Sequence, residues 1–185
     1  CLGGAMKDND YQPQKVEPYG TDWVIYPIDG YGTHDVIRSI LQKEKPDALW
    51  FMTDPRFYGW LWEIENEVRA NLPMIYYHVW DNQPYPVFNG IYYRSTDEVV
   101  CISKVTHEIL KNVSPEVSSC YLPHAVDSEF FYPYKSDEDL LISNDIRRRL
   151  TQSSINYSNP KKKVFFWNNR NARRKQPGTL IWWFK

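Results

Sequence analysis

The sequence predicts an α/β protein with a parallel β-sheet, and three observations lead to this fold class. Short runs rich in β-branched and aromatic residues alternate with longer segments of helical periodicity from residue 21 onward. One run, residues 48–52, is apolar at every position, which is typical of a parallel strand buried on both faces. The chain is 42% hydrophobic and 24% charged, as soluble globular proteins are. We therefore expect successive βα units around one sheet.

The first two thirds of the chain supply most of these elements. Residues 1–20 are polar, show no clear period and are expected to form a loop. Strands are then predicted at residues 23–26, 48–52, 74–79, 98–102 and 117–122. Apolar residues at helical spacing predict helices near residues 36–41, 60–68, 91–94 and 104–111. Ser103 is expected to cap the last of these helices, and Lys45-Pro46 to end the first.

The pattern changes after Pro123. The next residues have the composition of an irregular connector, residues 139–150 are expected to form a helix, and residues 151–160 are a linker rich in Ser and Asn. A new strand is predicted at residues 164–167, followed by a polar basic loop and a helix from Pro177. This order predicts three segments: a parallel-sheet domain at 1–127, a connector with a helix at 128–160, and the first βα unit of a second domain at 161–185.

The apolar residues at 180–184 indicate that this last unit is incomplete. A lone strand and helix cannot bury their own apolar faces. We therefore expect the sequence to be a fragment, or a truncated product, of a two-domain protein, and to fold only partly by itself.

Charge and cysteine content exclude some classes of protein. The formal net charge is −1, so the whole chain has no electrostatic preference for nucleic acid or membranes. No apolar run approaches the roughly 20 residues of a membrane-spanning helix, so no transmembrane segment is predicted. The three cysteines and four histidines do not group at metal-ligand spacing, so we expect no metal site. Thiols without a disulfide pattern indicate a reducing compartment, and we expect a cytoplasmic chain, either free or peripheral at a membrane.

Four polar residues lie where predicted strands end. Asp54 and Arg56 follow the second strand, and His78 and Asp81 lie at the end of the third. Open α/β sheets bind ligands at the carboxyl ends of their strands. Aromatic residues occur in the same two loops, and rings beside polar groups suit sugars or bases. These four residues are therefore candidates for a binding cleft, although a lone histidine at a strand end is more often structural.

The basic loop at residues 168–175 is the candidate anion site. Unpaired N–H groups and the positive end of a helix dipole face the loop that precedes a helix, and both attract phosphate. Arg170, Arg173, Arg174 and Lys175 add full charges to this loop. The sequence alone leaves open whether the loop binds phosphate or is a solvated basic turn.

Three motifs in series resemble those of the retaining GT-B glycosyltransferases of family 4. Val-Cys-Ile-Ser at residues 100–103, followed by a helix, resembles a family strand that ends in Ser. Leu-Pro-His-Ala-Val-Asp at 122–127 resembles the interdomain segment of the family. In the segment 165–176, an Arg and a Lys are separated by four residues, as in the family. Asn169 and Gln176 stand where the family usually has Gly, and its two-glutamate motif has no match within residues 1–185.

This resemblance implies two Rossmann-like domains with a cleft between them. It implies transfer of a hexosyl unit, with retention, from a nucleotide-diphosphate sugar to a sugar or other hydroxyl acceptor, either a carbohydrate or a lipid-linked one. Arg170 and Lys175 match the family's diphosphate-binding pair, and His78 or Asp81 resembles its acceptor-side contact. The donor sugar is a substrate, and no cofactor, metal or nucleic-acid partner is implied. No catalytic residue is assigned.

Two alternatives belong to other classes. The basic segment 161–175, with Trp167 among its aromatic residues, has the composition of a module that binds single-stranded nucleic acid or another phosphate ligand. The chain could also be an inactive fragment. Binding of nucleoside diphosphates distinguishes the two functions, because a glycosyltransferase is expected to bind them and a nucleic-acid-binding module is not.

Overall fold

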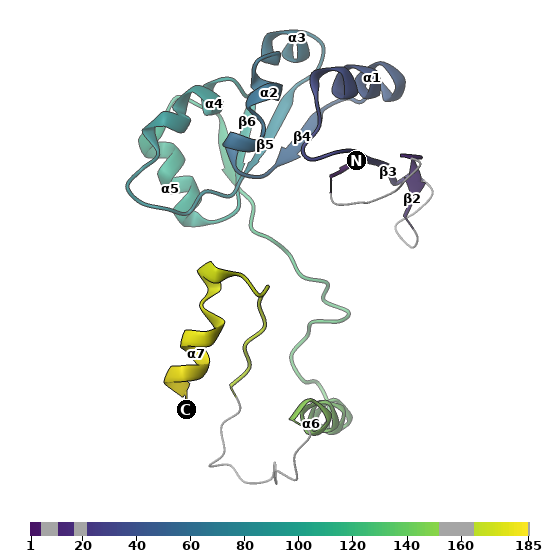
Figure 1. Cartoon of the computed structure of the whole chain (residues 1–185), viewed down its shortest axis with the longest axis vertical. Helices are drawn as coiled ribbons and strands as arrows, with labels where there is room; N and C mark the ends of the chain where they lie inside the picture. Colours follow the sequence, from purple (N-terminus) through teal and green to yellow (C-terminus); the bar gives the residue numbers. More distant parts are fainter. Residues whose placement is uncertain (5–10, 17–21, 152–164, 185) are drawn as a thin grey trace. The chain divides into compact units, whose positions relative to one another are not determined.

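The computed structural model describes residues 1–4, 11–16, 22–151 and 165–184 (Figure 1). The chain divides into two compact units, Cys1–Ala125 (unit 1) and Val126–Lys185 (unit 2). The division falls after residue 125 rather than after residue 127, where the sequence predicted it. The second predicted boundary, at 160/161, lies outside the described residues.

Unit 1 contains a four-stranded sheet in which every pairing is parallel (Figure 1). Its strands follow one another in space in chain order, β4 (Leu49–Met52), β5 (Met74–His78), β6 (Glu98–Cys101) and β7 (Ser119–Tyr121). The α/β class and the parallel sheet predicted from the alternating pattern are therefore confirmed.

The helices of unit 1 are α1 (His34–Glu44), α2 (Gly59–Trp62), α3 (Glu65–Arg69), α4 (Gly90–Arg94) and α5 (Lys104–Val113). Right-handed crossovers between strands that advance in one direction all lie on the same face of a sheet. One apolar core accordingly joins residues of these helices to alternate strand residues, among them Phe51, Tyr76 and Val99. Helices α1 and α3 lie side by side (Figure 1) and are joined by Arg38, whose guanidinium donates to both carboxylate oxygens of Glu67 at 2.8 and 2.7 Å.

The other face of β4 is open, which corrects the prediction that this strand is buried on both faces. Trp50 and Met52 alternate with the buried Phe51 and are 50% and 49% exposed. The apolar run could not show this, because burial of the second face requires crossovers on both sides of the sheet. Here the crossovers that follow β4, β5 and β6 cover one side.

The start of the chain differs from the prediction in two ways. Residues 1–20, expected to be a loop, contain the short strands β1 (Leu2–Gly3) and β2 (Gln14–Lys15). Both pair with β3 (Val24–Pro27), β1 in parallel and β2 antiparallel. Strand β3 therefore belongs to this three-stranded sheet and not to the parallel sheet that begins at β4.

Local capping follows the sequence closely. The Ser103 hydroxyl accepts a hydrogen bond from the backbone N–H of Thr106 at 3.0 Å, so its predicted role as the cap of α5 is confirmed.

The single helix predicted at residues 60–68 is wrong, because it is divided into α2 and α3. The backbone leaves helical geometry at Ile64, where φ is −114° and ψ is 19°.

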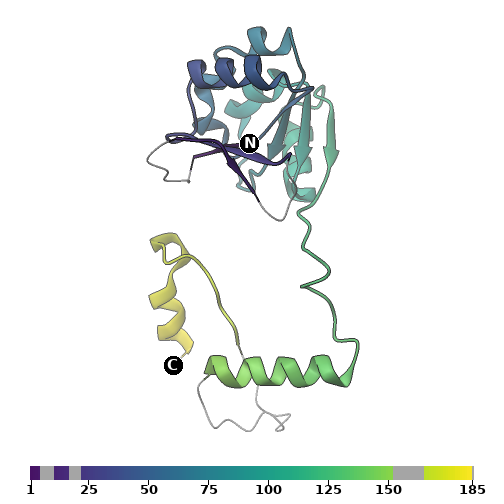
Figure 2. The ribbon, with the colours of Figure 1, turned by 90° about the vertical axis from the view of Figure 1, so that its right-hand side faces the viewer.

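Unit 2 contains α6 (Asp137–Thr151), the 3₁₀ helix η3 (Arg173–Lys175) and α7 (Pro177–Phe184), and Figure 2 shows α6 and α7 as separate helices. The helix predicted from Pro177 is confirmed. The strand predicted at 164–167 is wrong for residues 165–167, which have no strand structure; residue 164 lies outside the described residues. A strand needs a neighbouring strand to which its backbone is hydrogen-bonded, and no described residue of unit 2 belongs to a strand.

An ion-pair network fixes α3 to the start of β5. Asp97 accepts two hydrogen bonds from the Arg69 guanidinium, both at 3.0 Å, and one from the backbone N–H of Met74 at 2.8 Å. The Asp97→Ala variant should lower the free energy of unfolding by about 2 kcal/mol, because it leaves Arg69 and this N–H without their shared acceptor. Urea unfolding followed by circular dichroism measures the change. Asp47→Ala, an exposed loop substitution, should stay within about 0.5 kcal/mol of wild type, and equal losses would contradict the prediction.

Candidate functional site

The candidate residues of unit 1 lie where the strands of the parallel sheet end. Asp54 follows β4, His78 is the last residue of β5, and Asp81 lies in the loop after β5. Parallel strands bring their carboxyl ends to one edge, so the loops after β4 and β5 emerge beside each other. Each of these residues has a different local environment.

Asp54 and Arg56 form a pair within one loop. Asp54 is the N-cap of the 3₁₀ helix η1 (Pro55–Phe57), and its Oδ1 accepts from the backbone N–H of Arg56 at 3.2 Å. Its Oδ2 lies 3.0 Å from Nη2 of Arg56. The Asp54 side chain is 20% exposed and the Arg56 side chain 73%. The pair thus presents a donor and an acceptor together, with little net charge.

His78 is fully buried, so its side chain reaches no solvent in this conformation. Its Nε2 lies 2.8 Å from the Tyr93 hydroxyl, which also accepts from Nδ2 of Asn89 at 3.3 Å. Which of the two groups donates depends on whether the proton of the neutral ring is on Nε2 or on Nδ1. Among the described residues, this Nδ1 atom has no hydrogen-bond partner. The structure therefore places His78 within a buried network, where it contacts a ligand only through its neighbours.

Burial sets the electrostatics of this network. Desolvation lowers the pKa of His78 to about 4, so its ring is neutral at pH 7. Desolvation also raises the pKa of Tyr93 and Tyr76, and the Asp54 carboxylate contributes to both shifts. The Tyr76 hydroxyl donates to the carbonyl oxygen of Thr53 at 2.6 Å. Tyr76, His78 and Tyr93 are thus neutral at pH 7 and hydrogen-bonded beneath the edge of the sheet, and the Asp54 carboxylate acts on both tyrosines.

Asp81 is exposed, in a loop whose aromatic residues pack on each other. Trp80 contacts Phe88 edge to face, with ring centroids 5.8 Å apart. Among the four predicted cleft residues, the structure thus brings Asp54 and Arg56 into direct contact, leaves Asp81 available to solvent and encloses His78. Their roles toward an acceptor stay predictions.

Tyr31 is a surface residue that the sequence interpretation missed. It lies in the turn between β3 and α1, and its ring stacks on Phe57 with centroids 4.5 Å apart and an interplanar angle of 17°. In the sequence, Tyr31 lies between Gly30 and Gly32, which have φ values of 59° and 98°. The Gly-Tyr-Gly sequence, separated by three residues from the strand predicted at 23–26, was the available signal, because it indicates a turn after that strand.

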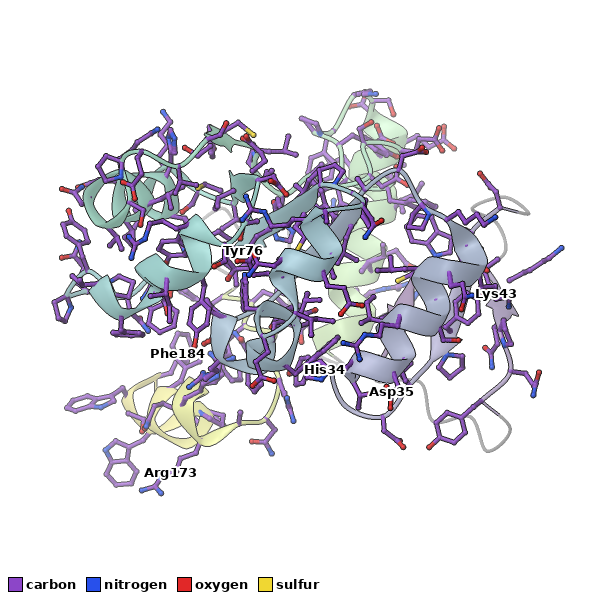
Figure 3. All side chains as sticks on the ribbon, turned by 90° about the horizontal axis from the view of Figure 1, so that it is seen from above. His34, Asp35, Lys43, Tyr76, Arg173 and Phe184 are labelled. Carbon is purple, nitrogen blue, oxygen red and sulfur yellow. The ribbon has the colours of Figure 1, made fainter. Side chains whose placement is uncertain are left out.

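In unit 2, the candidate phosphate residues lie on one tight turn before α7. The backbone N–H of Lys175 donates to the Ala172 carbonyl at 2.9 Å, and Ala172 N–H donates to the Arg170 carbonyl at 2.8 Å. Lys175 is half-buried, whereas Arg170 is exposed. Gln176 is left-handed, with φ 53° and ψ 45°. Figure 3 shows the Arg173 side chain projecting away from this segment.

The start of α7 leaves donors facing this turn. The first N–H groups of a helix have no intrahelical acceptor, and Pro177 at the first position has none to offer. Gly178 follows, with open space where a side chain would lie. The Thr179 hydroxyl donates to Oε1 of Gln176 at 2.8 Å, which ties the turn to the helix. The arrangement suits an anion, with four cations and no carboxylate among residues 165–184.

Within the described ranges, no three His, Cys, Asp or Glu side chains come together as metal ligands would. In the same part of the chain, every helix is too short or too polar to cross a bilayer.

Comparisons with models of protein families, with curated proteins and with solved structures find no match to this chain.

Proposed function

We propose that the chain is part of a GT-B glycosyltransferase that moves a hexosyl unit from a nucleotide-diphosphate sugar to a hydroxyl group of a carbohydrate or lipid-linked acceptor. In this proposal, unit 1 is an incomplete Rossmann-like acceptor domain and unit 2 begins the nucleotide-sugar domain. Transfer retains the anomeric configuration and uses no metal or other cofactor. Free thiols at Cys1, Cys101 and Cys120 agree with a reducing, cytoplasmic compartment.

The observation that carries the proposal is the conformation of Gln176. The motif resembled here has Gly at this position, and Gln176 adopts the left-handed backbone that glycine allows without strain. A non-glycine residue with this φ supports the reading that the turn needs this geometry. The turn brings Lys175 to the start of α7, five positions after Arg170.

The chemistry assigned to Arg170 and Lys175 is charge stabilisation. Breaking the glycosidic bond leaves a nucleoside diphosphate, whose negative charge grows as the bond lengthens. Cations and helix N–H groups held near that diphosphate stabilise the transition state more than the bound donor. On the acceptor side, the exposed Asp81 and the partly buried Asp54 are the carboxylates that could accept a hydrogen bond from the reacting hydroxyl.

Binding of UDP, ADP and GDP, measured by isothermal titration calorimetry, tests the donor site. Arg170→Ala and Lys175→Ala should each weaken binding about tenfold, since each removes a charge-assisted contact. Arg173→Ala and Arg174→Ala are the matched controls, because they remove the same charge from the same turn, and should change binding less than about threefold. If no diphosphate binds, or if all four variants weaken binding equally, the donor assignment is wrong.

A second candidate is favoured by the aromatic side chains beside the same cations. Phe165, Phe166 and Trp167 are 71%, 76% and 43% exposed, which suits stacking with bases of single-stranded nucleic acid. The predicted segment begins at residue 161, and residues 161–164 lie outside the described residues. Titration with oligo(dT) at several salt concentrations distinguishes the two functions. Affinity that falls steeply with salt, together with no response to nucleoside diphosphates, would replace the glycosyltransferase proposal.

A further inference from the structure

Tyr31 and Phe57 form an exposed aromatic pair at the carboxyl edge of unit 1. The two rings come from loops that are far apart in sequence, the turn before α1 and the 3₁₀ helix η1. Their side chains remain 45% and 38% exposed despite the stacking contact. Isolated exposed rings are ordinary, but two stacked rings at a ligand edge hold each other in one orientation and keep part of their apolar surface exposed.

Packing of neighbouring residues holds the Tyr31–Phe57 pair in place. Tyr58 contacts Tyr31 edge to face, at 6.1 Å and 82°, and its hydroxyl donates to the Met52 carbonyl at 3.1 Å. A Cβ at Gly32 would lie 3.1 Å from the Trp60 ring, so the turn that carries Tyr31 packs directly on that residue. Pro55, at the start of η1, is fully buried. A surface held in place before binding loses little conformational entropy when a ligand arrives.

Polar groups border the same surface. The Arg56 guanidinium carbon lies 5.2 Å from the centre of the Phe57 ring, and the guanidinium is paired with Asp54. Planar donors and a carboxylate side by side can bind two neighbouring hydroxyl groups, because one group donates and the other accepts. The surface therefore combines an aromatic face with hydrogen-bonding groups of both kinds.

We propose that Tyr31, Phe57, Arg56 and Asp54 form a saccharide-binding subsite, in which the C–H face of a pyranose ring packs on the aromatic pair and its hydroxyls bond to Arg56 and Asp54. The assignment of this saccharide as the acceptor rests on the proposed function. The site narrows the acceptor class to a carbohydrate, or to the sugar portion of a lipid-linked acceptor.

An anionic ligand fits the surface less well. A phosphate group would meet the Asp54 carboxylate 3.0 Å from the only cation named in this subsite, which cancels much of the attraction. A neutral polyhydroxylated ring meets no such electrostatic opposition.

Saturation-transfer difference NMR on the full chain tests the subsite, with methyl α-glucoside, methyl α-galactoside and maltose as probes and uridine as the competing class. We expect saturation of the ring C–H protons of at least one saccharide. The Tyr31→Leu and Phe57→Leu variants should each weaken its binding about fivefold, and Arg56→Gln should do the same. Trp50→Leu is the matched control: it removes an equally exposed ring from the open face of β4 and should leave binding unchanged.

The proposal is overturned if no saccharide is saturated, if uridine is the preferred ligand, or if the double variant Tyr31→Leu/Phe57→Leu binds as wild type does. Circular dichroism of each variant establishes that it is folded. The result of the saccharide-binding experiment is independent of the result of the diphosphate titration. Saccharide binding without diphosphate binding would keep the subsite and remove its role as an acceptor site, whereas the reverse result would remove the subsite alone.

Discussion

Replacing Tyr93 with phenylalanine should lower the free energy of unfolding by about 3 kcal/mol. The substitution removes a single oxygen atom, but that oxygen accepts from Asn89 and is also hydrogen-bonded to His78. All three side chains are at most 2% exposed, so neither partner can turn to bulk water. Each buried polar group left without a partner costs about 1 to 3 kcal/mol.

Urea unfolding monitored by near-ultraviolet circular dichroism measures this loss, and amide hydrogen exchange in β5 assigns it to unit 1. Tyr85→Phe is the matched control. The Tyr85 hydroxyl donates to Glu108 at 2.9 Å on the surface, so its loss should change the unfolding free energy by less than about 0.5 kcal/mol. Similar effects of the two substitutions would mean that the His78–Tyr93–Asn89 network does not stabilise the fold.

Acidification from pH 7 to pH 4 should destabilise unit 1 by about 3 kcal/mol through His78 alone. Burial lowers the pKa of His78 from 6.5 in the unfolded chain to about 4 in the folded chain. Between these values the unfolded state binds a proton that the folded state does not, so stability is full above pH 6.5 and is lost as pH falls toward 4. Each pH unit in this window contributes about 1.4 kcal/mol.

The His78→Leu variant should lose this pH dependence, although the substitution itself lowers stability at pH 7. Urea unfolding of both proteins at pH 7, 5.5 and 4.5 separates the two effects. His124 is the control histidine, because it is exposed beside Tyr77, and His124→Gln should keep the wild-type dependence on pH. If the difference between wild type and His78→Leu is constant with pH, the His78 ring is not held neutral by burial.

Carboxylates contribute to the pH dependence of stability in a separate, lower pH range. Burial opposes the shift, but hydrogen bonds from Arg69 and the Met74 N–H hold the pKa of Asp97 below its ordinary value of 3.8. Its stabilisation is therefore present above pH 4 and is lost only at lower pH. Measurements above pH 4.5 report mainly on His78.

The fold class and most element positions could be predicted from the sequence because they depend on neighbouring residues. The alternation of apolar runs and helical periods placed the four strands of the parallel sheet, and a hydroxyl at Ser103 was sufficient to locate the start of α5. The division of the helix at Ile64 could not be predicted in this way, because apolar spacing continues through it. The strand expected at 164–167 was inferred from apolar content alone, which does not supply a pairing partner.

The candidate sites divide in the same way. Arg170 and Lys175 were selected from four nearby cations because their spacing resembles that of the glycosyltransferase motif. The turn that joins them is a local structure, so their arrangement follows from residues close in sequence. The position of Asp54 beside Arg56 is local as well. By contrast, Tyr31 and Phe57 meet only because the β3–α1 turn packs beside η1, a contact between distant segments.

The sequence by itself determined the order of βα elements, the caps and the location of the polar residues at strand ends, since each is set by short-range periodicity and hydrogen bonding. Only the tertiary structure decided that one face of β4 is open, that His78 is enclosed with Tyr93 and Asn89, and that Tyr31 joins Phe57. The physical reason is that burial and long-range contact depend on which side of the sheet each crossover covers. The spacing of apolar residues along the sequence does not show which side of the sheet a crossover covers.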